Sequence, residues 1–97
     1  MKAVIDDVVV AEANDADIIS IEGNSYFPPS ALNQDAFEES PTPYTCPWKG
    51  DAQYWNVKGN KDAAWSYPII KPTAVDRVGK DFAGYVAFDK QQVTITG

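Results

Sequence analysis

The chain has 97 residues, which fits one domain with a single hydrophobic core and leaves no room for a second domain. Apolar residues make up 44% of the sequence and aromatic residues 12%, a composition typical of a folded protein. The formal net charge is −6, and the eight basic residues are scattered among fourteen acidic ones. A nucleic acid or an anionic membrane would need a clustered basic surface, so we expect neither as a partner.

The cysteine content and the N-terminal segment indicate the cellular compartment of the protein. Cys46 is the only cysteine, so no internal disulfide can form, whereas a secreted domain of this size would often contain one. Asp6 and Asp7 interrupt the apolar residues near the N-terminus, so these residues do not form a signal-peptide core. No apolar run approaches the roughly 20 residues that a membrane-spanning helix requires. These features predict a cytoplasmic protein.

The first predicted elements are short strands. Residues 3–5 and 8–11 are rich in β-branched side chains and flank Asp6-Asp7, which predicts a hairpin with its turn at the two aspartates. Residues 18–21 predict a third strand, and Gly23-Asn24 predicts the turn that follows it.

The next segment is dominated by proline. Residues 26–29 require extended backbone, because each proline restricts the residue before it. Ser30 is a candidate N-cap for one or two helical turns over residues 31–37. Residues 38–43 are acidic and contain two prolines, which predicts a loop.

The second half of the chain predicts two more hairpins. Residues 51–58 have strand character and lead through a turn at Gly59-Asn60 to a partner strand at 63–67. A short helix is predicted around residues 74–78. Residues 85–88 and 93–96 are predicted to pair with each other and close the chain as a hairpin. The pattern therefore predicts a mainly β domain over residues 1–97, with about seven strands and at most two short helices.

Five short motifs, in order along nearly the whole chain, carry a family resemblance. They are Tyr26-Phe27-Pro28-Pro29, Thr45-Cys46-Pro47-Trp48-Lys49-Gly50, Tyr54-Trp55 after Ala52, Ala63-Ala64-Trp65-Ser66-Tyr67-Pro68, and Gly84-Tyr85-Val86-Ala87-Phe88 with Val93-Thr94-Ile95-Thr96-Gly97. With these motifs the chain resembles the bacterial and fungal family called domain of unknown function 427. The resemblance implies a small twisted antiparallel β-sheet or partly open barrel of the β-tent, or Mss4-like, fold group, with one or two short helices. No catalytic residue is established for the family, so the resemblance assigns none.

Two kinds of chemistry associated with this resemblance find no support in the residues. The fold group includes zinc-binding proteins, but this chain offers one cysteine and no histidine, so we expect no metal and no cofactor. The family has also carried the label nucleotidyltransferase. That chemistry commonly uses a Gly-Ser turn before an Asp-x-Asp pair, and no Gly-Ser precedes Asp15-Ala16-Asp17.

Three polar residues are candidates for catalysis. Cys46 is the only thiol nucleophile, and no histidine is available as its base, so packing in the core is the competing interpretation. Lys49 precedes Gly50, whose freedom allows a tight turn that could direct the ammonium into a cavity, and the competing interpretation is a solvated surface lysine. Asp62 is a candidate general base or lysine partner, against the simpler interpretation of a turn aspartate.

The aromatic residues within 44–68 are the most informative feature. Alternation along a strand directs Tyr54 and Trp55 to opposite faces, and it directs Trp65 and Tyr67 to the same face. This pattern suits either a packed core or a cleft with aromatic walls. The predicted ligand-binding residues are Trp48, Lys49, Gln53, Tyr54, Trp55, Trp65, Ser66 and Tyr67.

The leading hypothesis is a module that binds a small polar or anionic molecule between Trp48, Trp55 and Trp65, with Lys49 supplying the charge. The first alternative is a small enzyme without a metal that uses Cys46 or Lys49 covalently. The second is a scaffold for protein partners, in which Tyr26, Phe27 and Phe37 form a contact patch if they are exposed. The oligomeric state is not encoded in any feature of the sequence.

Overall fold

The structure is a computed structural model that describes residues 1–97, with nine strands in three antiparallel sheets, one α-helix and no closed barrel. The strands are β1 (Lys2–Ile5), β2 (Val8–Glu12), β3 (Ile19–Ile21), β4 (Asn24–Tyr26), β5 (Phe37–Cys46), β6 (Gly50–Val57), β7 (Asn60–Ser66), β8 (Val86–Phe88) and β9 (Thr94–Thr96). The prediction of a mainly β domain is confirmed. Its membership of the β-tent group stays a prediction.

Three hairpins close through two-residue turns in which both residues have positive φ. The turns are Asp6-Asp7 (50° and 63°), Glu22-Gly23 (53° and 80°) and Lys58-Gly59 (51° and 79°). Turns of this kind match the right-handed twist of the strands that they join. The first turn is confirmed. The other two lie one residue earlier than predicted, because the following asparagines pair as strand residues.

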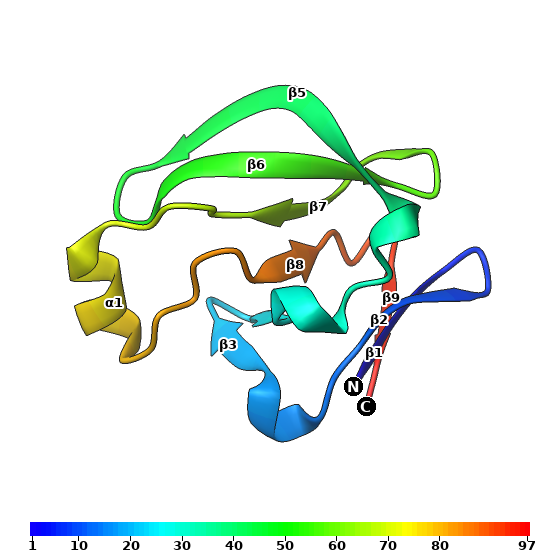
Figure 1. The fold of residues 1–97 in the computed structure, drawn as a ribbon, viewed down its shortest axis with the longest axis horizontal. Coiled ribbons are helices and arrows are strands. Elements are labelled where there is room, and N and C mark those ends of the chain that lie inside the picture. Colours follow the sequence, from blue (N-terminus) through cyan, green and yellow to red (C-terminus); the bar gives the residue numbers. More distant parts are fainter.

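The largest sheet has the strand order β5-β6-β7-β8, and its strands β5, β6 and β7 form the top of the molecule in Figure 1. The predicted loop at residues 38–43 is wrong, because these residues belong to β5. A proline cannot donate to a neighbouring strand, but β5 is an edge strand, where an unpaired side is tolerated. The ladder is irregular between Glu39 and Pro43, where the register with β6 shifts.

The predicted C-terminal hairpin is also wrong. β8 pairs with β7, so that Ala87 lies opposite Trp65, whereas β9 pairs with β1, so that Ile95 lies opposite Ala3. Figure 1 shows the consequence of the second pairing, since the two termini lie side by side. The small sheet has the order β2-β1-β9.

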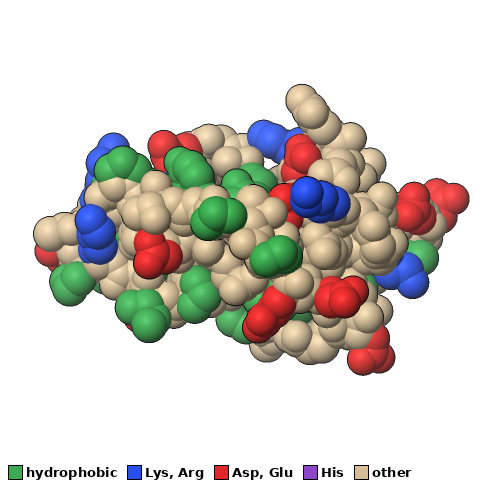
Figure 2. Space-filling model, turned by 90° about the horizontal axis from the view of Figure 1, so that it is seen from above, with side chains coloured by type: hydrophobic (Ala, Val, Ile, Leu, Met, Phe, Trp, Pro, Cys, Tyr) green, Lys and Arg blue, Asp and Glu red, His purple; other side chains and the backbone are tan.

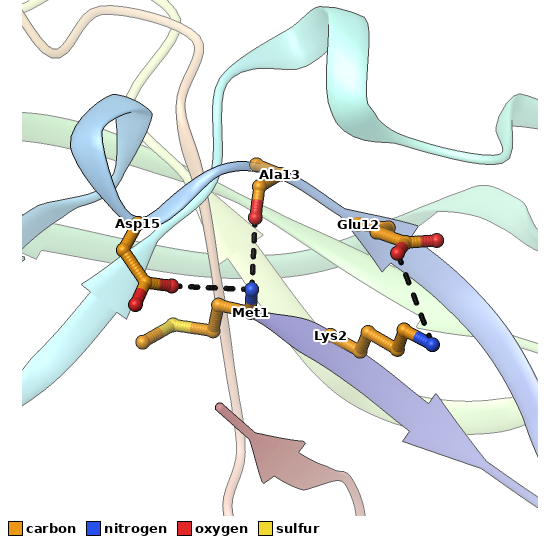
Figure 3. A network of polar contacts seen from close by, with 5 residues as sticks. All are labelled: Met1, Lys2, Glu12, Ala13 and Asp15. Atoms are coloured by element: carbon orange, nitrogen blue, oxygen red, sulfur yellow. Dashed lines mark hydrogen bonds and ion pairs between the residues drawn. The ribbon is translucent and has the colours of Figure 1, made fainter.

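Polar contacts fasten the start of the small sheet (Figure 3). The Met1 ammonium donates to the Ala13 carbonyl at 2.9 Å and to the Asp15 carboxylate at 3.2 Å. Lys2 and Glu12 form an ion pair at 3.8 Å between β1 and β2, with both side chains at least half exposed. Such an exposed pair contributes little stability, about 1 kcal/mol at most.

Helical structure is limited to short segments. Two 3-10 turns, Pro29–Ala31 and Gln34–Ala36, occupy the segment predicted as one or two helical turns, and Ser30 lies inside the first of them, so it does not cap it. The helix α1 spans Pro72–Val78 and ends at Gly79, whose φ of 83° is favourable only for glycine. The helices of this fold lack the length and the apolar character that a membrane-spanning helix requires.

The buried residues form two clusters. One contains Phe27 and Val57 and joins the small sheet to β6, β7 and β8. The other contains Tyr26, Cys46 and Tyr67, with Phe82 and the α1 residue Ala74 among its further members. Tyr26 is 1% exposed and Phe27 is fully buried, so the proposed contact patch that includes them is wrong. The face above β5 in Figure 2 shows hydrophobic side chains dispersed among polar and charged ones.

Candidate functional site

A cavity of about 200 Å³ lies between the β3–β4 hairpin and the four-stranded sheet. We name it the tyrosine cavity, and its lining residues are Asn24, Tyr26, Tyr44, Lys49, Tyr54, Trp65 and Tyr67. A larger groove of about 620 Å³ runs along residues 50–53 and 68–71, but no buried charged side chain lines it. Lys49 is the only buried charged residue of the protein, and it lines the tyrosine cavity. This cavity is therefore the candidate site.

The pairing of β6 with β7 places the aromatic wall. Tyr54 lies opposite Trp65, and their rings are 6.4 Å apart between centroids. Tyr67 follows two residues after Trp65, so it returns to the same side and lines the same cavity. Trp55 is on the other face of β6, where its ring meets Phe37 at 6.5 Å. The predicted separation of Tyr54 from Trp55 is thus present in the structure.

The turn between β5 and β6 places Lys49. Gly50 has a φ of 127°, and a Cβ atom at this position would lie 2.9 Å from the Ile69 carbonyl oxygen, so only glycine fits without displacement of the backbone. The Lys71 amide donates to the Lys49 carbonyl at 3.0 Å and fixes the turn from the other side. The Lys49 side chain is therefore directed inward, which is one of the two orientations that the motif allowed, and the solvated surface lysine is wrong.

The Lys49 ammonium has one anionic partner and two aromatic ones. It donates to the Glu22 carboxylate across a separation of 27 residues. Its nitrogen also lies 4.5 Å from the centre of the Trp48 ring and 5.4 Å from that of Tyr67. Each cation–π contact contributes about 0.5–2 kcal/mol, more where water is excluded. Together these contacts offset the cost of burying a charge that is only 5% exposed.

The phenol groups around Lys49 differ in their hydrogen bonds. The Tyr26 hydroxyl accepts a hydrogen bond from the Trp65 indole nitrogen at 3.1 Å. The Tyr67 ring is buried, but its hydroxyl is open to the cavity and makes no hydrogen bond to any protein group. Burial raises the pKa of Tyr26, Tyr54 and Tyr67 above the ordinary value of 10.0. These three groups therefore stay protonated at neutral pH and can act as hydrogen-bond donors.

Trp48 lies beside the cavity and contacts two cations. The Arg77 guanidinium carbon is 4.3 Å from the centre of its ring, in addition to the Lys49 contact. Phe82 meets the same indole edge-on at 6.4 Å. Trp48 therefore supports Lys49 from outside the cavity lining.

The other predicted site residues are held by different partners. Cys46 is 6% exposed within the second cluster. Asp62 accepts hydrogen bonds from the Ser40 hydroxyl at 2.5 Å and the Thr42 hydroxyl at 2.8 Å, and the Ser40 bond is the main cause that lowers the pKa of this carboxyl. Asp62 forms no ion pair with a lysine, and the partner of Lys49 is Glu22.

Two predicted binding residues make internal hydrogen bonds away from the cavity lining. The Gln53 amide donates to the Ser40 carbonyl at 3.0 Å, and the Ser66 hydroxyl accepts from the Trp55 indole at 3.0 Å. No group of three or more histidine, cysteine, aspartate or glutamate side chains converges in a way that could hold a metal ion.

Sequence reasoning missed four residues of this site. Glu22, Asn24 and Tyr26 come from the β3–β4 hairpin, and Tyr44 comes from the strand that was predicted as a loop up to residue 43. Nothing in the local sequence marks Glu22 as the partner of Lys49.

Comparison with known proteins gives one result. A search of curated proteins found no match to the chain. The model of the family described as Domain of unknown function (DUF427) matches residues 1–96. The match extends over the β3–β4 hairpin, the Lys49 turn and the aromatic strands, which together form the tyrosine cavity. The chain therefore belongs to the family Domain of unknown function (DUF427).

Proposed function

We propose that this protein binds a small polar or anionic molecule in the tyrosine cavity. The observation that carries the proposal is the buried Lys49 ammonium beside the Tyr67 hydroxyl, which has no protein partner. No buried side-chain polar atom of the protein lacks a hydrogen-bond partner, so the Tyr67 hydroxyl is open to the cavity, where a ligand or water can accept its hydrogen bond. An aromatic wall with a few convergent polar groups is the usual composition of a small-molecule site.

The size of the cavity limits the ligand. A volume of about 200 Å³ is smaller than the roughly 300–1,000 Å³ of sites for drug-sized molecules. A compound with a single ring or a short chain is therefore the expected class. We place this activity in the cytoplasm on the basis of the single cysteine.

The covalent enzyme has less support than the binding module. An amine acts as a nucleophile in its neutral form, whereas Lys49 makes an ion pair and two cation–π contacts as an ammonium. Cys46 is buried among the apolar residues of the second cluster, where a thiol is usually inert.

The proposal is tested by an NMR titration of the labelled protein against pooled metabolites, including nucleotides with Mg²⁺. We expect a saturable shift of the Trp65 indole signal, because this indole lines the cavity. Trp55 provides an internal control, since its indole is bonded to Ser66 on the opposite face of the sheet. Equal shifts of both indoles, or no shift of either across all pools, would contradict the proposal.

A further inference from the structure

The ion pair in the tyrosine cavity is asymmetric. The Lys49 side chain is 7% exposed, whereas the Glu22 side chain is 57% exposed. Lys49 is held by its turn and by two aromatic rings, while Glu22 lies in the two-residue turn at the tip of the β3–β4 hairpin. The positive charge is thus fixed, and the carboxylate is the partner that can leave for solvent.

Glu22 uses only part of the hydrogen-bonding capacity around it. Its Oε1 atom accepts from Lys49, and no protein donor contacts its other oxygen. A lysine ammonium has three donors, of which Glu22 takes one. The hydroxyls of Tyr54 and Tyr67, which also line the cavity, have no acceptor in the protein. The cavity therefore offers a carboxylate more donors than Glu22 occupies.

We propose that the ligand is a small organic acid whose carboxylate replaces that of Glu22 on Lys49. This inference rests on the proposed function and specifies its ligand class and its regulation: Glu22 is a built-in occupant that competes with the ligand. The carboxylate of the ligand accepts from Lys49 with one oxygen and from a tyrosine hydroxyl with the other. Its apolar part packs against the rings of Tyr54 and Trp65.

The available space is consistent with this class. A water molecule occupies about 30 Å³ in the liquid, so the cavity has the volume of roughly seven waters. That volume suits an acid with one ring.

A competing carboxylate in the same protein lowers the affinity for a ligand acid both by occupying Lys49 and by repelling a second negative charge.

The experiment compares benzoate with its neutral counterpart benzamide in titrations that follow the Trp65 indole signal. Three variants are used: Glu22→Gln, which removes the competing charge, Lys49→Met, which removes the fixed charge, and Glu12→Gln, a matched control on β2. Glu12 is also an exposed glutamate with a lysine partner. Its replacement by glutamine changes the net charge of the protein by the same amount as Glu22→Gln. Thermal unfolding confirms that each variant is folded.

We expect Glu22→Gln to bind benzoate about two- to fivefold more tightly than the original protein, the factor that corresponds to the loss of an ion pair with one exposed partner. Glu12→Gln should leave benzoate binding unchanged, benzamide should respond to neither glutamate variant, and Lys49→Met should lose benzoate binding. If Lys49→Met does not fold, the comparison of the two glutamate variants decides the question alone.

The two proposals fail in different ways. If Glu22→Gln binds benzoate no more tightly than the original protein, or if both glutamate variants strengthen binding equally, Glu22 is not a competitor and the inference is wrong. If benzoate binds to none of the proteins while an uncharged metabolite shifts the Trp65 indole, the inference is wrong and the proposed function stands. If neither charged nor neutral compounds shift that signal, both are wrong.

Discussion

Two buried tyrosines of the cavity provide a matched test of its internal geometry. Tyr26 is 1% exposed and Tyr67 is 4% exposed, so Tyr26→Phe and Tyr67→Phe each delete one hydroxyl from a buried ring. The Tyr26 hydroxyl accepts the Trp65 indole N–H at 3.1 Å, whereas the Tyr67 hydroxyl has no protein partner. The same chemical change is therefore expected to have different effects on the free energy of unfolding.

The magnitudes follow from the hydrogen bonds that are lost. Tyr26→Phe leaves the indole N–H of the half-buried Trp65 without an acceptor, which costs about 1–3 kcal/mol. Because Trp65 is only half-buried and water can reach part of it, the lower end of that range is expected. Tyr67→Phe breaks no protein hydrogen bond, so its effect should lie within about 0.5 kcal/mol of zero.

Thermal unfolding measures both values on the same scale. A change of 1 kcal/mol shifts the Tm of a domain of 60–100 residues by about 4–8 °C, so Tyr26→Phe should lower Tm by at least about 4 °C. Tyr67→Phe should lie within about 3 °C of the original protein and should instead weaken the binding of a cavity ligand. Equal destabilisation by the two variants, or a larger loss for Tyr67→Phe, would refute the assignment of a free hydroxyl to the cavity.

Three further predictions concern the turn at Gly50, the Ser40 hydroxyl of β5 and the Cys46 thiol. Gly50→Ala should lower the free energy of unfolding by about 1–3 kcal/mol, because the new Cβ meets the Ile69 carbonyl at a φ of 127°, and urea denaturation would show no loss if this geometry is wrong. Ser40→Ala should raise the pKa of Asp62 toward 3.8, which is observable in an NMR titration of its carboxyl carbon, and an unchanged pKa would exclude the hydrogen bond as the cause. A carboxyl whose pKa is lowered by folding stabilises the fold at pH values above its pKa in the unfolded chain, and this stabilisation is lost as the pH falls through its pKa in the folded protein. The Ser40→Ala variant should therefore lose less stability on acidification. Cys46 should resist alkylation in the folded protein and react after denaturation, and rapid modification of the native thiol would restore the enzyme alternative.

The limits of sequence reasoning about the fold are clear in β5. Strand character was hidden by Pro41 and Pro43, which normally exclude a segment from a sheet. Whether a proline is tolerated depends on whether its side of the strand has a neighbour, and that is a property of the whole sheet. The order β5-β6-β7-β8 leaves β5 at the edge, so both prolines are accommodated.

The C-terminal strands illustrate a related limit. The β-branched residues correctly indicated two strands, at Val86–Phe88 and Thr94–Thr96, but proximity in the sequence suggested that they pair with each other. Each instead pairs with an earlier strand, β8 with β7 and β9 with β1. Periodicity identifies which segments are extended, whereas the choice of partner depends on how the remaining apolar surfaces can be buried together.

The residues of the candidate site also differ in whether local sequence rules or the packing of distant segments places them. Tyr54, Trp65 and Tyr67 could be assigned to one face because alternation within adjacent strands is a local rule, and Lys49 was marked by the glycine that follows it. Glu22 and Tyr26 could not be assigned, because they reach the cavity through the docking of a separate hairpin.

That docking explains why a cavity exists at this position. The β3–β4 hairpin joins the large sheet through two backbone hydrogen bonds between Phe27 and Val86, at 2.8 and 2.9 Å, which lie at one end of the junction. Beyond them the contacts involve side chains, from Tyr26 to Trp65 and from Glu22 to Lys49, and the Lys90 ammonium donates to the Gly23 carbonyl in the hairpin turn at 2.9 Å. A two-stranded hairpin has little stability of its own, so these contacts set its position. Because the Glu22 contact ends on an exposed carboxylate, an anion that replaces Glu22 on Lys49 can enter without breaking the backbone pairing of Phe27 with Val86.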